Sequence, residues 1–122
     1  MKKILLIEDE SALQKTLDDF LKSEGYETVS ALDGEKGVKL AKANKPDLIL
    51  LDLVLPKMHG FDVLKKLKED SKTKTIPVII LTNLETTGDV EKALGLGAST
   101  YLVKASYTLK EVLSKIKKEL DE

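Results

Sequence analysis

The feature that most constrains the fold of this 122-residue chain is a repeated alternation between short apolar runs and segments with helical periodicity. Five runs are predicted strands, at Ile4–Ile7, Glu27–Ala31, Leu48–Leu51, Val78–Leu81 and Tyr101–Val103. Between and after them, apolar residues recur with the spacing of a buried helical face. Five strand–helix units in succession predict a doubly wound α/β fold, in which helices cover both faces of a parallel sheet.

Polar residues indicate where several of the helices begin. Ser11 and Gln14 fit a capping box at the start of the first helix, and Thr108 and Glu111 fit one at the start of the fifth. Asp33 is suited to cap the second helix. The apolar face of the fourth helix is predicted to contain Val90, Ala93, Leu94 and Gly97. Because no linker or repeat interrupts the pattern, we expect residues 1–122 to form one domain.

Composition excludes several classes of protein. The chain has no cysteine, which excludes a disulfide scaffold and a thiolate metal site, and its only histidine is His59, which excludes a multi-histidine metal site. Its net charge of −1 argues against a strongly cationic surface, so direct nucleic-acid binding is not expected. No apolar run is long enough to span a membrane, and no signal peptide is recognisable, so we expect a cytoplasmic protein.

Side chains that can carry chemistry follow four of the five predicted strands. They are Glu8, Asp9 and Glu10 after the first strand, Asp52 after the third, Thr82 after the fourth and Lys104 after the fifth. The carboxyl ends of parallel strands share one edge of a sheet, and ligands of such folds bind outside that edge. We therefore expect these residues to form one cluster in space, although they are scattered in the sequence.

The chemistry of such a cluster favours phosphoryl transfer. Carboxylates at close range repel one another, and Mg²⁺ relieves that repulsion because it prefers oxygen ligands. An aspartate such as Asp52, at the end of an apolar run, can act as a nucleophile and form an acyl phosphate. Thr82 and Lys104 could then contact phosphoryl oxygens. Each residue alone also fits an ordinary role as a cap, loop or surface residue, and only their combination points to this chemistry.

With these residues in place, the chain resembles the response regulator receiver domains of two-component signalling, in particular single-domain chemotaxis regulators. The resemblance covers nearly the whole chain and is carried by four segments in order, Ile4–Glu10, Asp52–Gly60, Leu81–Thr82 and Tyr101–Lys104. It implies a flavodoxin-like fold with strand order 2-1-3-4-5. It also implies a signalling switch that assists its own phosphorylation, rather than an enzyme that turns over external substrates.

The resemblance implies a phosphoacceptor and a metal site. Asp52 would accept a phosphoryl group from the phosphohistidine of a sensor histidine kinase or phosphotransfer protein. Asp9, Asp52 and the backbone carbonyl of Val54 would bind Mg²⁺ directly, and Glu8 would act mostly through metal-bound water.

The resemblance also implies a switch. Lys104 and Thr82 would contact the phosphoryl group, the Thr82 hydroxyl moving toward it while the Tyr101 ring turns inward. An ordinary edge-strand tyrosine is the alternative interpretation of Tyr101. The surface formed by the fourth helix, fifth strand and fifth helix would then change its affinity for a downstream protein target.

The sequence departs from the family pattern around the predicted site. Glu8 replaces the more common aspartate, and its longer side chain still reaches a metal-bound water. His59 stands where aspartate is frequent and is interpreted as a solvated loop residue. Ala105 replaces a proline that usually follows a cis bond, and because a cis bond before alanine costs about 2.5–4 kcal/mol, we expect Lys104–Ala105 to be trans or strained.

Three further departures concern access to Asp52 and the fate of a bound phosphoryl group. Asn83 is bulkier than the small residue usual after the threonine, and we expect it to crowd the phosphoryl site. Val54 and Leu84 occupy the positions that flank the path of the hydrolytic water in the family. Both are apolar and cannot orient a water molecule, which predicts a long-lived aspartyl phosphate.

Other classes of protein fit the residues less well. A haloacid-dehalogenase-type phosphatase needs a second aspartate two residues after the nucleophile, where this chain has Val54. A flavodoxin-like carrier needs a hydroxyl- and glycine-rich loop after the first strand, where this chain has three acids. The alternative kept open is a pseudo-receiver, a phosphorylation-independent interaction module, which would be expected to lack Asp52 or Lys104. The sequence fits either a stand-alone regulator or a piece of a longer one.

Overall fold

The computed structural model describes residues 1–84 and 86–122 and contains a five-stranded sheet of order β2-β1-β3-β4-β5. The strands are β1 (Lys3–Ile7), β2 (Glu27–Ala31), β3 (Leu48–Leu51), β4 (Val78–Thr82) and β5 (Thr100–Val103). Every neighbouring pair is parallel. The predicted α/β class and the implied strand order are both confirmed.

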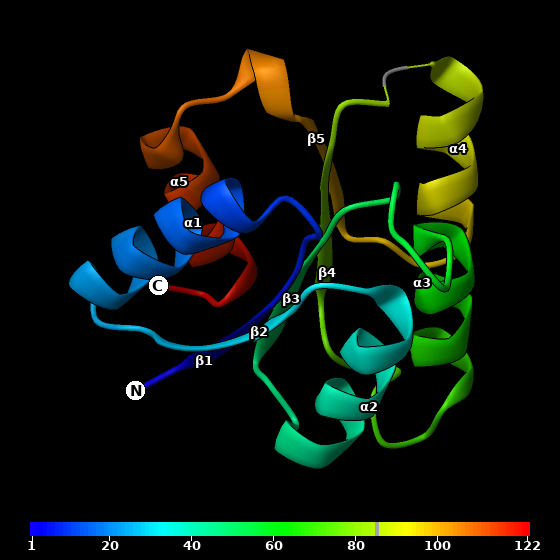
Figure 1. Ribbon diagram of the computed structural model, residues 1–122, viewed down its shortest axis with the longest axis horizontal. Helices are drawn as coiled ribbons and strands as arrows, with labels where there is room; N and C mark the ends of the chain where they lie inside the picture. Colours follow the sequence, from blue (N-terminus) through cyan, green and yellow to red (C-terminus); the bar gives the residue numbers. More distant parts are fainter. Residues whose placement is uncertain (85) are drawn as a thin grey trace.

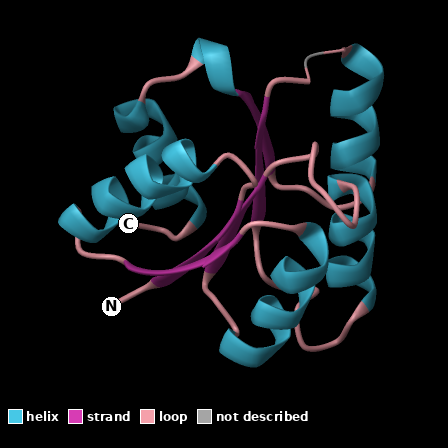
Figure 2. Cartoon of the chain, viewed as in Figure 1, coloured by secondary structure: helices cyan, strands magenta, loops and turns pink. Residues whose placement is uncertain are grey.

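Helices cover both faces of this sheet (Figures 1 and 2). They are α1 (Ser11–Ser23), α2 (Gly34–Asn44), α3 (Gly60–Glu69), α4 (Thr87–Gly95) and α5 (Leu109–Glu119), with a short 3₁₀ helix, η1 (Lys104–Ser106), before α5. Helices α1 and α5 pack on one face, and α2, α3 and α4 pack on the other. In the described part of the chain no helix is long and apolar enough to cross a membrane.

The central strands are apolar at every position because both of their faces are covered. Leu5 and Ile7 of β1 point into the core beneath α2, α3 and α4, whereas Ile4 and Leu6 point into the core beneath α1 and α5. Each of these four side chains is at most 1% exposed. Burial on both faces is the usual reason for a continuous apolar run in a parallel strand.

Two of the predicted helix caps are confirmed. The Asp33 carboxylate accepts a hydrogen bond from the Lys36 N–H at the start of α2. At the start of α5, the Thr108 hydroxyl accepts from the Glu111 N–H, and the Glu111 carboxylate accepts from the Thr108 N–H. Both caps satisfy backbone donors that have no partner within the helix.

The predicted capping box of the first helix is wrong. The N-cap of α1 is Glu10, which makes no side-chain capping bond, and Ser11 is already the first helical residue. The side-chain amide of Gln14 donates to carbonyl groups outside the helix instead. Ser11 and Gln14 therefore have the spacing of a capping box, but they do not form its hydrogen bonds.

The predicted apolar face of α4 is also wrong in part. The helix ends at Gly95, so Gly97 lies beyond it with a positive φ of 108°. Ala93 is fully buried, but the Leu94 side chain is 46% exposed. Helix α4 lies over the β5 side of the sheet, and Ala93 is its fully buried residue. The apolar face that α4 buries is therefore narrower than that of an ordinary amphipathic helix.

Candidate functional site

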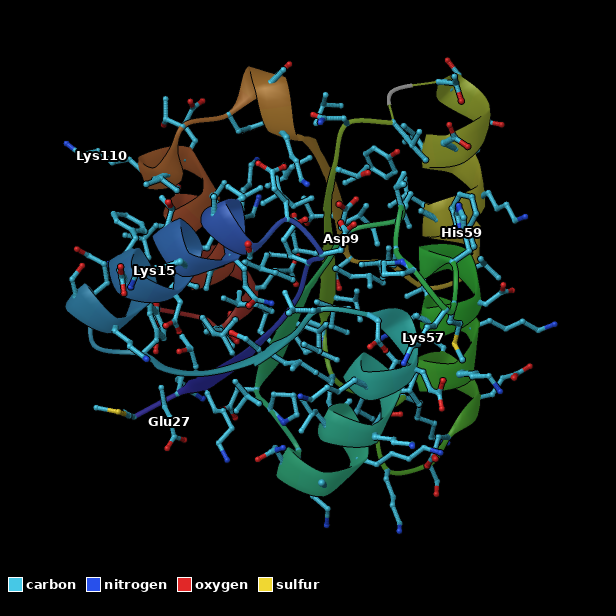
Figure 3. All side chains as sticks on the ribbon, viewed as in Figure 1. Asp9, Lys15, Glu27, Lys57, His59 and Lys110 are labelled. Carbon is cyan, nitrogen blue, oxygen red and sulfur yellow. The ribbon has the colours of Figure 1, made fainter. Side chains whose placement is uncertain are left out.

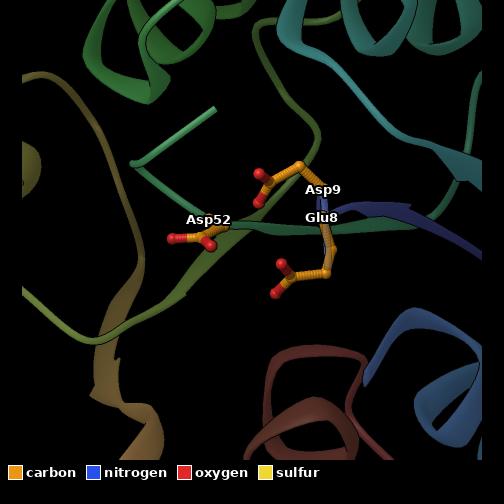
Figure 4. A group of neighbouring side chains, drawn as sticks. All are labelled: Glu8, Asp9 and Asp52. Carbon is orange, nitrogen blue, oxygen red and sulfur yellow. The ribbon is translucent and has the colours of Figure 1, made fainter. Parts of the chain in front are cut away.

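Three carboxylates meet at the carboxyl edge of the central strands. Glu8 directly follows β1, and its N–H donates to the Ala31 carbonyl at 3.0 Å; Asp52 directly follows β3, and its N–H donates to the Ile7 carbonyl at 3.0 Å. These backbone bonds continue the ladder of the sheet past the ends of the strands. One carboxylate oxygen from each of Glu8, Asp9 and Asp52 lies within 4.8 Å of the others (Figure 4).

The three acids differ in exposure. Glu8 and Asp52 are only 4% and 6% exposed, whereas Asp9 is exposed. Asp9 lies near the centre of the view, after the end of β1, while Lys110 extends outward from the region of α5 (Figure 3). Two buried carboxylates and one solvent-facing carboxylate form a site that a cation can reach from solvent. This set of hard oxygen donors suits Mg²⁺.

Lys104 provides the positive charge beside the buried acids. Its Nζ lies 2.6 Å from Glu8 Oε1 and 2.9 Å from Asp52 Oδ2. Burial alone would lower the pKa of the Lys104 ammonium, but the hydrogen bonds to Glu8 and Asp52 outweigh that effect and raise it. Lys104 therefore stays charged between the two carboxylates.

The surroundings of the Glu8 carboxyl disfavour its ionised form. Its pKa is raised by burial, and the nearby negative charge of Asp52 raises it further. Hydrogen bonds from Lys104 and from the Glu10 N–H, which lies 3.0 Å from Glu8 Oε2, oppose the shift. A divalent cation at this position would relieve the repulsion that raises the pKa of Glu8.

The acids and Lys104 line a cleft of about 300 Å³ together with residues from the neighbouring loops. The lining residues are Glu8, Asp9, Glu10, Asp52, Val54, Thr82, Asn83 and Lys104. The structure thus brings together each predicted site residue except Tyr101. Within the cleft, the Val54 N–H donates to Asp52 Oδ1 at 3.3 Å, and the Val54 side chain is 55% exposed.

Thr82 is the last residue of β4 and is completely buried beside this cleft. Among the described residues, its hydroxyl is the one buried side-chain polar atom without a hydrogen-bond partner. An unsatisfied buried hydroxyl costs about 1–3 kcal/mol, and such groups in native structures call for an explanation. A ligand in the cleft that accepts a hydrogen bond would remove this cost.

Tyr101 lies outside the cleft, on the side of the sheet covered by α4. Its ring is half-buried against the core there, and its hydroxyl donates to the Leu84 carbonyl at 2.6 Å. Burial raises the pKa of the Tyr101 hydroxyl, and the charges of Asp89 and Asp52 add to the effect. The ring thus already faces inward and connects β5 to the segment after β4. Nothing in the sequence pattern pointed to Leu84 as its partner.

The departures from the family pattern have visible structural consequences. The described residues contain no cis peptide bond, so Lys104–Ala105 is trans, and it lies within η1. His59 is exposed, as expected of a solvated residue, but it also caps α3, where its Nδ1 accepts from the Phe61 N–H at 3.1 Å. Asn83 is exposed at the rim of the cleft.

The comparison with protein families agrees with this geometry. The model of the response regulator receiver domain matches residues 4–117, and the chain belongs to that family. Receiver domains are the signalling switches of two-component systems, and the acidic cluster fits the magnesium site expected of them.

Individual relatives extend the comparison. The DNA-binding dual master transcriptional regulator RpaA of Synechocystis is 39% identical over 117 residues, which are 96% of this chain and 48% of that protein. The chain spans about half the length of the first curated relatives it matches.

Solved structures show the same fold. A CheY-like receiver domain from Methanospirillum hungatei superposes with a TM-score of 0.93 at 28% identity, covering 99% of this chain and 94% of that one. The receiver domain of the sensor histidine kinase PA1611 from Pseudomonas aeruginosa, with a magnesium ion coordinated in its active site cleft, superposes with a TM-score of 0.90 at 28% identity. That match covers 99% of this chain and 98% of that one.

Proposed function

We propose that this chain is a phosphorylation-dependent switch that accepts a phosphoryl group on Asp52. The observation that carries the proposal is the position of the Asp52 carboxylate, which lines an open cleft together with the Lys104 ammonium and the Glu8 and Asp9 carboxylates. A buried carboxylate that borders a cleft, paired with a cation and next to further metal ligands, is suited to nucleophilic attack on phosphorus.

The residues around Asp52 have separate roles in the phosphoryl transfer. An Asp52 oxygen forms the new bond to phosphorus as the bond from phosphorus to the donor nitrogen breaks, and the donor imidazole leaves with the electron pair. The Val54 N–H and Lys104 already orient the two oxygens of Asp52. After the transfer, the Lys104 ammonium can pair with a phosphoryl oxygen. Bound Mg²⁺ would neutralise a further part of the negative charge on the phosphoryl group. Such transfers depend on positioning and charge stabilisation more than on acid–base catalysis.

The proposed donor is the phosphohistidine of a sensor histidine kinase or a phosphotransfer protein. The proposed output is a protein target that binds the surface formed by α4, β5 and α5. Tyr101 supports this route because its hydrogen bond to the Leu84 carbonyl links β5 to the segment after Thr82. With a net charge of −1, the chain itself is proposed to act through protein contacts rather than on nucleic acid.

The experiment that tests the proposal is incubation with acetyl phosphate and Mg²⁺, followed by intact mass measurement. We expect the gain of one phosphoryl group, no gain when EDTA replaces Mg²⁺, and loss of the group in hydroxylamine, which cleaves acyl phosphates. Failure to incorporate phosphate from acetyl phosphate or from a phosphorylated histidine protein would contradict the proposal and favour a phosphorylation-independent interaction module.

The aspartyl phosphate is expected to persist well beyond seconds. Val54 is more than half exposed beside Asp52, and its apolar side chain, like that of Leu84, cannot orient a water molecule for attack. Val54→Gln is expected to shorten the lifetime of the aspartyl phosphate about tenfold or more. The glutamine amide can hold a water molecule in position to attack the phosphorus, and holding a reactant in position speeds its reaction. Decay would be followed by intact mass after removal of the donor.

A matched control for this lifetime is Leu32→Gln. Leu32 is another exposed apolar side chain, but it does not line the cleft. The prediction is contradicted when the wild-type phosphate is lost within seconds without a phosphatase, or when both variants change the lifetime equally.

Thr82→Val is expected to stabilise the unphosphorylated protein while weakening its response to phosphorylation. Valine matches threonine in shape, so the substitution removes the unsatisfied hydroxyl and raises the free energy of unfolding by about 1–3 kcal/mol. The phosphoryl group then lacks the hydrogen bond proposed for Thr82. Urea unfolding with and without beryllofluoride measures both effects. A destabilised variant, or one with the wild-type response to beryllofluoride, would refute the proposed role.

A further inference from the structure

The side-chain amide of Gln14 joins three segments behind the acidic cluster. Its Nε2 donates to the Glu8 carbonyl at 3.1 Å and to the Ala31 carbonyl at 2.9 Å. The Ala31 carbonyl also accepts from the Glu8 N–H at 3.0 Å. Three hydrogen bonds thus fix the backbone of Glu8 between the end of β2 and the first turns of α1.

The chemistry of this position is specific for a side chain with two donor hydrogens. Both partners are carbonyl oxygens, which only accept, so the group between them must donate twice. The amide nitrogen of Gln14 does so without adding charge. A hydroxyl would satisfy one carbonyl, and a carboxylate would repel both.

The loop of consecutive acids at residues 8–10, called the acidic loop below, requires a group that fixes its backbone. Glu8, Asp9 and Glu10 are consecutive acids, and the carboxylates of Glu8, Asp9 and Asp52 have oxygens within 4.8 Å of one another. Their mutual repulsion favours an open loop in the absence of a cation. Asp9 is exposed, so few neighbours hold its side chain, and its direction depends on the peptide that joins it to Glu8. The carbonyl of that peptide is the group that Gln14 holds.

We propose that Gln14 is a positioning residue for the metal-binding acids. By fixing the Glu8 carbonyl, it sets the direction in which Asp9 leaves β1 and so keeps the acids together before Mg²⁺ arrives. The inference rests on the proposed function, because it concerns the same site, but it assigns to this amide a role in metal affinity rather than in phosphoryl transfer. The general expectation is that loss of a partner that orients metal ligands weakens metal affinity about 10–100-fold.

The test is Gln14→Met, which keeps a long unbranched side chain and removes both donor hydrogens. We expect the Mg²⁺ dissociation constant, measured by isothermal titration calorimetry, to rise about tenfold or more. In metal-free protein, hydrogen exchange of the Glu8 amide should accelerate. The limiting rate of phosphorylation by acetyl phosphate at saturating Mg²⁺ should stay near the wild-type rate. Gln14→Ala serves as a second variant should Gln14→Met fold poorly.

The matched control is Thr16→Ala on the same helix. The Thr16 hydroxyl donates to the Ala12 carbonyl within α1, away from the acidic loop. An unchanged Mg²⁺ affinity in the Gln14 variants, an unchanged Glu8 amide exchange, or an equal loss of affinity in Thr16→Ala would overturn the inference. Wild-type protein that binds Mg²⁺ but takes up no phosphoryl group would contradict the proposed function and leave the affinity test of Gln14 intact.

Discussion

Asp52→Asn is expected to take up no phosphoryl group from acetyl phosphate under conditions in which the wild-type protein is fully modified. The amide nitrogen and the neutral carbonyl oxygen of asparagine are poor nucleophiles, so the acceptor is lost while the shape of the side chain is kept. Intact mass measurement gives the result directly. Modification of the variant at the wild-type rate would show that the acceptor lies elsewhere.

The loss in Asp52→Asn should not come from unfolding. The single amide oxygen of asparagine can still accept from either the Val54 N–H or Lys104, so one of these two hydrogen bonds is lost, and Lys104 keeps its pair with Glu8. Removing the charge of one of the three neighbouring carboxylates also relieves repulsion. We expect the metal-free free energy of unfolding to change by less than about 1 kcal/mol, within the range of one net hydrogen bond.

Mg²⁺ provides a second readout for Asp52→Asn. A ligand present at 100 times its dissociation constant stabilises the folded protein by about 2.7 kcal/mol, and a variant that lacks one ligand should gain less at the same concentration. Asp19→Asn is the control, since Asp19 is an exposed acid on α1 whose partner is the exposed Lys15. The control should match the wild-type protein in both phosphorylation and Mg²⁺ stabilisation.

The main outline of the site could be predicted because topology gathers the ends of parallel strands. Glu8, Asp52, Thr82 and Lys104 are separated by 96 residues from first to last, yet each comes at or directly after the end of a strand. The register of the sheet then leaves little freedom in where their backbones lie. Once the strands are assigned correctly from the sequence, the positions of these cleft residues can therefore be predicted from the topology of the sheet.

The details that sequence could not predict depend on partners from other segments. Gln14 has the spacing of a capping residue, but its amide bonds to the Glu8 carbonyl and to that of Ala31, 17 residues away. Leu94 has the periodicity of a buried residue, but the extent of burial depends on where α4 lies against the sheet. Both errors arose because a local pattern was interpreted without the tertiary contact that decides its meaning.

Lys104→Met is expected to slow phosphorylation about 100-fold or more and to destabilise the metal-free protein. The Lys104 ammonium lies within hydrogen-bond distance of both Glu8 and Asp52, and all three side chains are 13% exposed or less. Removing one partner of a buried ion pair typically costs about 3–5 kcal/mol, because the remaining charge is left without compensation. Removing a group that stabilises charge in a transition state typically costs about 10²–10³ in rate.

The destabilisation of Lys104→Met should depend on pH and on Mg²⁺. The pKa of Glu8 is already raised, and without Lys104 its carboxyl should retain a proton to still higher pH. The folded variant then binds more protons than the unfolded chain, so its stability falls as pH rises above the ordinary range of a glutamic acid. Saturating Mg²⁺ should restore part of the loss, since it supplies positive charge at the same carboxylates. Urea unfolding at two pH values, in EDTA and in Mg²⁺, measures each effect.

Two further variants separate charge from geometry at Lys104. Lys104→Arg keeps the charge in a wider, planar group, so it should recover much of the stability but little of the phosphorylation rate. Combining Lys104→Met with Asp52→Asn removes one charge of each sign, so the double variant should be more stable than Lys104→Met alone, with a coupling energy of about 0.5–3 kcal/mol. Strictly additive effects would mean that Lys104 and Asp52 do not interact in solution, and the role proposed for Lys104 would then have no structural basis.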